Sequence, residues 1–463
     1  MSRAGSPASL DLPHELEHAR ALDAADALAP MRARFALPRA SDGEPLVYLC
    51  GHSLGLAPLA ARTLVIEEID AWERLGVRGH EHAPRDWIGY AERLQPALAR
   101  LVGAGPAEVV AMNSLSVNLH LLLASFYRPA GRRTAILIES GAFASDRYAV
   151  ASQLAWHGLD PATDLIELAP RPGEDVLRIE DVEQRLASEG ERIALVLWPG
   201  VQYLTGQAFE LARLTRAAQA AGALIGLDLA HAIGNIPLQL HADGVDFAVW
   251  CSYKYLNAGP GALGGAFVHE RHATAMASAP ATGATSTDSS TTAHPGAGSA
   301  TPAAVLPRLE GWWGHAPQNR FEMRHGFTPA AGAAAWALSN PPILATAPLL
   351  ASLPLFETAG MTALHAKSEA LTAYARALLQ QHCAAGLTLL TPPEPGRHGA
   401  QLSLRVHGGA QRGRHVFEQL DRQGIVCDRR EPDIIRFAAV PLYNRFEDLC
   451  RCVAALATAL QAS

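Results

Sequence analysis

The stretches ALIGLDLAHAIGN (residues 223–235) and GVDFAVWCSYKYLNAGPGALGG (residues 244–265) decide how this chain folds. Each contains a short apolar run with a charged residue at or just past its end, Asp228 in the first and Lys254 in the second. Such runs are typical of buried parallel strands whose C-terminal ends carry chemistry. The two side chains are therefore expected to lie close together at one edge of a parallel sheet.

An aspartate and a lysine on neighbouring strand ends are what an enzyme using pyridoxal 5'-phosphate (PLP) needs. The lysine amine forms a Schiff base with PLP, and the aspartate keeps the pyridine nitrogen protonated so that the ring accepts electrons. Taken alone, Asp228 and His231 read as a capped helix start, and Lys254 as a solvated strand end. The helix start near Ser114–Ser116, suited to phosphate, and the aromatic Phe143 on another strand-end loop favour the functional interpretation.

Alternating strand and helix patterns predict an α/β fold, with a mostly parallel central sheet covered by helices on both faces. The patterns predict helices over residues 10–34, 59–75, 112–127 and 210–220, and strands over residues 134–139, 193–198, 401–406 and 434–438. We expect an N-terminal segment (1–60) packing with a small C-terminal α+β domain (346–463), and a large PLP-binding domain (61–345). Residues 278–304 are rich in Ala, Ser, Thr, Gly and Pro and are expected to form a flexible loop.

Composition narrows the setting of the protein. A chain of 463 residues is too long for a single hydrophobic core, so a large and a smaller domain are expected. The net charge of −7 argues weakly against nucleic acid or an anionic membrane surface as partner. The N-terminal stretch is too polar for a signal peptide, and no apolar run is long enough to span a bilayer. The six scattered cysteines fit reduced thiols, so a cytoplasmic protein is expected.

Three weaker motifs need separate treatment. Gly259-x-Gly261-x-x-Gly264 matches a dinucleotide-binding pattern, but a strand-like segment follows it, so a turn passing close to the lysine is the better account. His80 and His82 lie in a polar stretch (76–87) expected to be a loop; a structural role or a substrate contact is favoured over metal, and we expect no metal site. Arg436 follows a short apolar strand and suits either a substrate carboxylate or a surface ion pair.

Taken together, motifs from Tyr48 to Asn444 resemble the kynureninase family over nearly the whole chain. The motifs are YLCGHSLGLAP, NSLSVNLHLLLASFYRP, AFASDRYAVASQLAWHGLDP, DLAHAIGNIPL, DFAVWCSYKYLNAGPG, GWWGH, SNPPIL and VPLYN. The resemblance implies the aspartate-aminotransferase type fold (fold type I) and a homodimer. It also implies PLP-dependent hydrolysis of the Cβ–Cγ bond of L-kynurenine, and of its 3-hydroxy form, to anthranilate (or 3-hydroxyanthranilate) and L-alanine in tryptophan catabolism.

The same resemblance assigns roles to individual residues. It implies PLP on Lys254, with Asp228 on the pyridine nitrogen and Tyr253 on the phosphate. Tyr253 or the cofactor phosphate is a candidate base for hydrating the substrate carbonyl. Further cofactor contacts are implied for Leu115, Ser116, Phe143, Ala144, Ser145, Asp146 and His231, with Trp312 and Asn340 reaching the cofactor from the partner subunit. Substrate contacts are implied for His80, Ser339, Asn340 and Arg436, the last on the substrate carboxylate.

Three departures from the family pattern accompany the resemblance. Pro199 replaces a hydroxyl residue near the cofactor, His52 stands where Asn is usual, and the loop before Trp312 is longer. Two competing interpretations also remain at this point. One is a related PLP enzyme of the same fold, such as a cysteine desulfurase or an aminotransferase; the other is a PLP-binding protein without activity.

Overall fold

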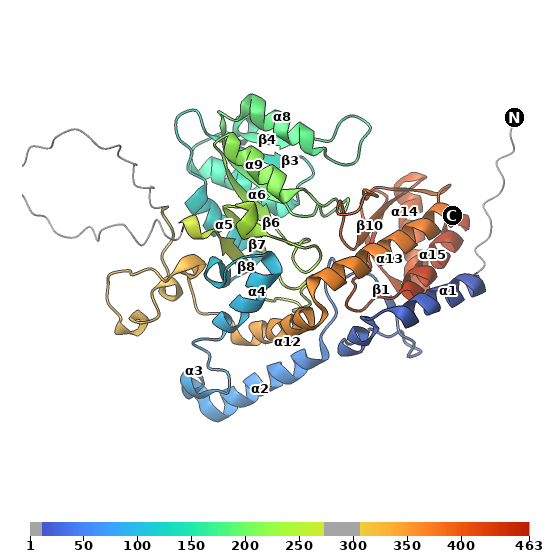
Figure 1. The fold of residues 1–463 in the computed structure, drawn as a ribbon, viewed down its shortest axis with the longest axis horizontal. Helices are drawn as coiled ribbons and strands as arrows, with labels where there is room; N and C mark the ends of the chain where they lie inside the picture. The colour runs from blue at the N-terminus through green and yellow to red at the C-terminus, as the bar shows by residue number, and fades with distance from the viewer. Residues whose placement is uncertain (1–11, 273–305, 463) are drawn as a thin grey trace, which may run out of the picture.

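The structure, a computed structural model, describes residues 12–272 and 306–462, so the loop predicted over residues 278–304 lies outside the described residues. The chain forms a larger part built on a seven-stranded sheet and a smaller part at the other end of the molecule (Figure 1). Helix α1 (Leu12–Ala25) lies in the smaller part beside the last helix, α15 (Phe446–Gln461).

The large sheet has the strand order β2-β8-β7-β6-β5-β3-β4. Every neighbouring pair is parallel except the two made by β8, which runs against both β2 and β7. This arrangement confirms the predicted α/β fold with a mostly parallel sheet. The strands are β2 (Val109–Ala111), β3 (Ala135–Glu139), β4 (Leu165–Leu168), β5 (Ile193–Pro199), β6 (Leu224–Asp228), β7 (Phe247–Trp250) and β8 (Gly265–Val268).

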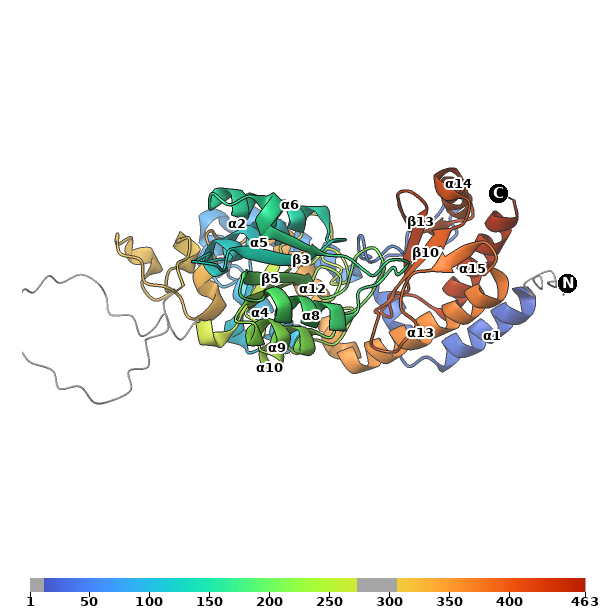
Figure 2. The same cartoon turned by 90° about the horizontal axis from the view of Figure 1, so that it is seen from above.

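Helices cover both faces of this sheet, which is why its strands are apolar throughout. Alternate side chains of a strand point to opposite faces, so Leu137 packs in one core while Ile136 and Ile138 pack in the other. Figure 2 shows α5 and α6 on one face and α4, α8, α9 and α10 on the other. These helices are α4 (Gln95–Val102), α5 (Leu115–Phe126), α6 (Ala144–Trp156), α8 (Ile179–Glu189), α9 (Leu211–Ala220) and α10 (Leu240–Asp243), with the short α7 (Pro161–Asp164) before β4.

The smaller part holds a four-stranded antiparallel sheet in the order β12-β13-β10-β9. The N-terminal segment joins it because β1 pairs with β11, and Asp23 of α1 accepts hydrogen bonds from the first two backbone N–H groups of α15. Its elements are β1 (Val47–Tyr48), α13 (Met361–His382), β9 (Leu387–Leu389), β10 (Gln401–Val406), α14 (Gly409–Arg422), β11 (Ile425–Val426), β12 (Asp428–Arg430) and β13 (Ile434–Ala438).

Helix α12 (Ile343–Ala359) packs against α2 (Leu59–Leu75), and its Leu349, Leu353 and Phe356 belong to the core of the larger part. We therefore propose that the larger part extends to Gly360, slightly beyond the boundary expected near residue 345.

No single described helix is long and apolar enough to cross a membrane. The bent pair α12–α13, with 81° between its members, meets the length and composition criteria only when the two helices are taken together.

Two local predictions were wrong. The helix expected over residues 10–34 ends at Ala25, and a 3-10 helix follows at Ala29–Arg34, where Pro30 lacks the N–H that a continuing α-helix needs. The loop expected over residues 76–87 contains a 3-10 turn (Gly76–Arg78) and the one-turn helix α3 (Gly79–His82). Side-chain hydrogen bonds to α2 fasten this stretch, and no local sequence pattern reveals them.

Candidate active site

A pocket opens at the C-terminal ends of β3, β5 and β6 and at the loop after β7. It collects side chains from five separate stretches of sequence, because the ends of parallel strands meet at one edge of the sheet. The pocket is lined by Leu115, Ser116, Ile138, Glu139, Ala142, Phe143, Ser145, Asp146, Leu197, Trp198, Pro199, Val201, Tyr203, Asp228, Ala230, His231, Tyr253 and Lys254.

Lys254 and Asp228 lie in this pocket together, as their positions on neighbouring strands predicted. The Lys254 Nζ is 5.9 Å from the ring centroids of both Phe143 and Tyr253. Gly55 packs on the backbone of this lysine loop: an added Cβ would lie 2.3 Å from the Lys254 carbonyl oxygen. The lysine thus sits on a backbone held by close packing, and its amine faces aromatic rings.

The Asp228 carboxylate is almost buried, and one of its oxygens accepts a hydrogen bond from the Ala230 N–H at 2.6 Å. Asp146, on the first turn of α6, is its closest acidic neighbour. Burial and then the negative charge of Asp228 raise the pKa of Asp146 well above its usual range. The buried Asp146 carboxyl therefore holds its proton more tightly than an ordinary aspartate does.

Glu139 is a third carboxyl group in the pocket, and it was not among the predicted site residues. Burial, and in smaller part Asp228, raise its pKa to about 8, although a hydrogen bond from Gln202 opposes the shift. The residue ends strand β3. Its position at the end of an apolar strand, like that of Asp228, was the signal that could have identified it.

The first turn of α5 faces the pocket with Leu115 and Ser116. The residue before the helix, Ser114, makes no side-chain cap hydrogen bond, which leaves the first backbone N–H groups available to an anion. Gly264 lies directly against this turn, since an added Cβ would be 3.2 Å from the Leu115 nitrogen. The glycine-rich segment thus serves close backbone packing, and the strand β8 follows it as expected.

His231 is buried beside Asp228, and burial followed by the charge of Lys254 lowers its pKa well below its usual range. Its Nδ1 finds no hydrogen-bond partner among the described residues. The ring of His52, fully buried, lies 6.3 Å from the His231 ring, and its pKa is lowered in the same way by burial and then by Arg436. Both imidazoles are therefore neutral at the working pH.

Arg436 is buried on β13 and borders this site through Tyr203. Its guanidinium donates hydrogen bonds to the Tyr203 carbonyl and to the Asp428 carboxylate, and lies 5.8 Å from the Tyr203 ring centroid. The Tyr203 ring in turn meets the Phe143 ring at 5.1 Å. Tyr203 and Asp428 were not predicted; Tyr203 follows strand β5, but the sequence holds no pattern that pairs either residue with Arg436.

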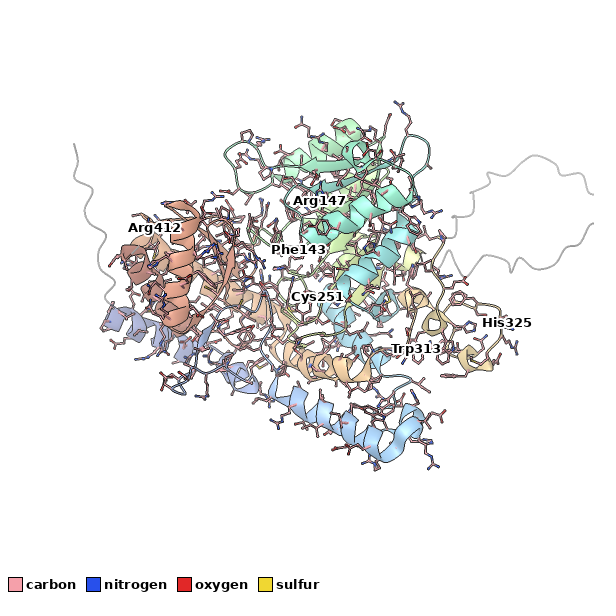
Figure 3. All side chains as sticks on the ribbon, turned by 180° about the vertical axis from the view of Figure 1, so that it is seen from behind. Phe143, Arg147, Cys251, Trp313, His325 and Arg412 are labelled. Atoms are coloured by element: carbon pink, nitrogen blue, oxygen red, sulfur yellow. The ribbon has the colours of Figure 1, made fainter. Side chains whose placement is uncertain are left out.

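Several predicted residues do not line this pocket. Ala144 begins α6 beside it, whereas His80, Trp312, Ser339 and Asn340 lie elsewhere. Ser339 and Asn340 line a second cavity with Trp313 and Arg320. We call residues 79–92 and 311–342 the outer face; Figure 3 shows Trp313 and His325 on the side of the larger part away from the smaller part, with Phe143 and Cys251 nearer the middle.

Two groups of described residues place three metal-ligand side chains within 4.8 Å of one another: Cys50, His52 and Asp428, and Glu108, His241 and His269. In each group the carboxylate already has partners, Arg436 for Asp428 and the His241 ring for Glu108. The expected absence of a metal stays a prediction.

The comparisons with known proteins match this geometry. The Kynureninase C-terminal domain model matches residues 364–456, and the Aminotransferase class-V model matches residues 66–300. A kynureninase of Xanthomonas oryzae pv. oryzae is 55% identical over 432 residues, covering 93% of this chain and 95% of the relative. The chain belongs to the kynureninase family. A kynureninase of Xanthomonas campestris pv. campestris is 52% identical, covering 95% of this chain and 97% of the relative.

Solved structures extend the likeness to the fold alone. The cysteine desulfurase CsdA of Escherichia coli has a TM-score of 0.71 at 16% identity, covering 94% of this chain and 98% of that one. A cysteine desulfurase of Thermococcus onnurineus NA1 has a TM-score of 0.68 at 16% identity, covering 90% of this chain and 95% of that one. The kynureninase family and the cysteine desulfurases share this fold. Because the chain belongs to the kynureninase family, the kynureninase interpretation is accepted over the desulfurase one.

Proposed function

We propose that the pocket at the strand ends is where this member of the kynureninase family hydrolyses L-kynurenine to anthranilate and L-alanine, a step of tryptophan catabolism. The observation that supports this location most is the convergence of Lys254 and Asp228 with the first turn of α5. Addition of kynurenine to the PLP-loaded protein should release anthranilate, followed by its fluorescence. Absence of anthranilate would refute the assignment.

The residues present fit PLP, the cofactor of the family. Lys254 would hold the aldehyde carbon, Asp228 the pyridine nitrogen, and the first turn of α5 with Tyr253 the phosphate; Phe143 would lie over the ring. When bound, PLP supplies an electron sink that stabilises negative charge at the Cα and Cβ atoms of the substrate. The chain's own contribution is to place Asp228 at the end of β6, beside an Asp146 carboxyl whose pKa is raised by burial.

Lys254 is proposed to move a proton at the Cα of the substrate once its amine is released from the cofactor. Tyr253 is less suited to act as the base that activates water, because burial and the neighbouring Cys251 raise its pKa above the usual range. Its hydroxyl keeps its proton at neutral pH and can donate it to the substrate carbonyl oxygen as the hydrate forms. Tyr253 is therefore proposed as a proton donor in the hydration step.

Arg436 is proposed to hold the substrate carboxylate through a bidentate pair. The Tyr203 carbonyl holds the Nη1 and the Asp428 carboxylate the Nη2 of the guanidinium, which fixes the group at the border of the pocket. That anchoring presents a fixed cation to a substrate whose amine lies at Lys254.

We further propose a homodimer in which the outer face of one subunit completes the pocket of the other. Trp312 is 46% exposed and Asn340 is exposed in the single chain, while Phe143 at the pocket is 43% exposed. Large apolar side chains left in water mark surfaces that another protein covers. A second copy would cover Phe143 and bring Trp312 and Asn340 to the cofactor, with Ser339 and His80 lining the space for the substrate's aromatic ring.

Mixing two inactive variants tests the shared site. Lys254→Ala subunits and Asn340→Ala subunits, exchanged at equal concentration, should regain about a quarter of wild-type turnover, because half of the dimers then carry one intact site. Sizing by light scattering checks that dimers form. No recovery from exchanged dimers would show that Asn340 acts within its own subunit or not at all.

The polar groups of His80, Ser339 and Asn340 would also suit a 3-hydroxy group on the ring, so we propose that 3-hydroxy-L-kynurenine is accepted too. Side-by-side kcat/KM values for the two substrates test this.

We also propose a cytoplasmic location, which the six unpaired cysteines support. Cell fractionation tests it.

A further inference from the structure

The segment that carries His80 is fastened to α2 through one buried carboxylate, that of Glu68. The residue is only 1% exposed. It accepts hydrogen bonds from the Arg85 Nε at 2.6 Å, the Trp87 Nε1 at 2.9 Å and the Tyr90 hydroxyl at 3.0 Å. A charged acceptor makes each of these bonds strong, and removing it would leave buried donors without partners.

Trp87 connects this carboxylate to His80. The edge of one ring meets the face of the other, with centroids 5.4 Å apart and planes 84° apart. A Cβ added to Gly79 would lie 2.3 Å from the Trp87 ring, so the backbone before His80 rests directly on the indole. The Ile88 N–H donates to the His80 carbonyl at 3.2 Å. The indole therefore fixes both the backbone and the ring of His80.

His80 itself is exposed, on the one-turn helix α3 at the end of α2 far from the smaller part (Figure 1). An exposed imidazole on a helix of four residues would ordinarily sample many positions. Here the buried network underneath restricts it. The sequence thus keeps one side chain available to a ligand or a second subunit while it immobilises the segment beneath.

We propose that Glu68 is a positioning residue for the kynureninase reaction, which it serves by holding Trp87 and thereby setting the place of the His80 imidazole against the aromatic ring of the substrate. The inference rests on the proposed function, in which His80 lines the space for that ring. Glu68 is buried beneath this segment, so its effect passes through the side chains it holds, among which Trp87 contacts the His80 ring.

Two variants and one matched control test the inference. Glu68→Gln keeps the shape of the side chain, but its amide would turn a donor towards the Trp87 N–H or leave another donor unpaired. Trp87→Phe removes the N–H and keeps an aromatic ring under Gly79. The control is Glu67→Gln: Glu67 is the neighbouring, 47% exposed carboxylate, which pairs with Arg85 and not with Trp87.

Both test variants should raise the KM for kynurenine by roughly 10- to 100-fold, the cost of a misplaced binding group. The affinity for L-alanine, the product without an aromatic ring, should stay unchanged when followed by the absorbance of bound PLP. Thermal unfolding checks that each variant is folded. Glu67→Gln should behave as wild type.

A double-mutant cycle with His80→Ala gives the deciding readout. If Glu68 acts through His80, Glu68→Gln should have no further effect on KM in the His80→Ala background. A normal KM in Glu68→Gln and Trp87→Phe, with a raised KM in His80→Ala, would overturn the inference and leave the proposed function intact. Equal losses of kynurenine and alanine binding in Glu68→Gln would also overturn the inference, because they would show that the variant damages the structure of the site in general. A wild-type KM in His80→Ala would overturn the inference through the role proposed for His80, while anthranilate release from the wild type would still support the reaction.

Discussion

The strand-end pocket and the outer face (residues 79–92 and 311–342) hold the two halves of the predicted site, and they are built differently. In the pocket, Lys254 and Asp228 lie at or just past the ends of neighbouring strands of one sheet, and Asp228, Asp146 and His231 are buried within a single chain. On the outer face, Trp312 and His80 are exposed and lie on short helical turns. Lys254 and Asp228 thus meet within a single chain, whereas Trp312 and His80 are left exposed at a distance from them.

The two regions hold their side chains in place by different means. Parallel strands fix the pocket residues through backbone hydrogen bonds and a core on each face. The outer face relies on side-chain networks such as the one centred on Glu68. Variants in the first region should therefore change the chemistry, and variants in the second should change the choice and binding of substrate.

The largest effect is expected for Lys254→Ala. Removing the amine should abolish the proposed covalent link to PLP and the group proposed to move the Cα proton, so kcat should fall by about 10⁴-fold or more. Borohydride trapping of PLP and steady-state anthranilate release measure the two losses. Retained turnover would break the assignment of this lysine to the pocket chemistry.

A smaller loss is expected for Asp228→Asn, which removes the carboxylate proposed to hold the pyridine nitrogen. The kcat should fall by about 10²- to 10³-fold with PLP still bound. Asp146→Asn is the matched comparison: because burial raises the pKa of Asp146 and so favours its neutral form, a neutral amide there should cost much less. Equal losses in the two variants would contradict the separate roles of the two residues.

Arg436→Lys should act mainly on substrate binding. A lysine cannot make the bidentate pair, so the KM for kynurenine should rise by about 10-fold or more with a smaller change in kcat. Arg405→Lys is the control, since Arg405 on the adjacent strand β10 makes only a partly exposed pair with Asp175. A normal KM in Arg436→Lys would place the carboxylate elsewhere.

The smallest effect concerns stability and Glu139. Its pKa rises from 4.5 when unfolded to about 8 when folded, so the folded state binds the proton more tightly. The contribution is fully present below pH 4.5 and is lost as the pH rises towards about 8, by a few kcal/mol at most. Urea unfolding of the PLP-free protein should show this loss, and Glu139→Gln should flatten it; an unchanged pH dependence in that variant would show that Glu139 ionises normally.

Much of the fold could be read from local patterns. The helix predicted over residues 59–75 and the strands over 401–406 and 434–438 coincide with α2, β10 and β13. Their apolar residues recur with the period of the element, which places them on one face, where burial in the core stabilises them. The helical turns within the loop expected over residues 76–87 escaped prediction, because the contacts that hold this stretch reach back to Glu68, which lies in α2 and outside the local pattern.

By itself the sequence determined that Asp228 and Lys254 follow adjacent buried strands, since apolar runs ending in a charged residue have one stable place in a parallel sheet. Only the tertiary structure decided which carboxyl groups share that pocket and where their protons lie. Glu139 and Asp146 acquire raised pKa values from burial beside Asp228, and burial is a property of the assembled core. The tertiary structure likewise decided that His80 rests on Trp87, because contacts between side chains depend on how helices and loops pack and not on local periodicity.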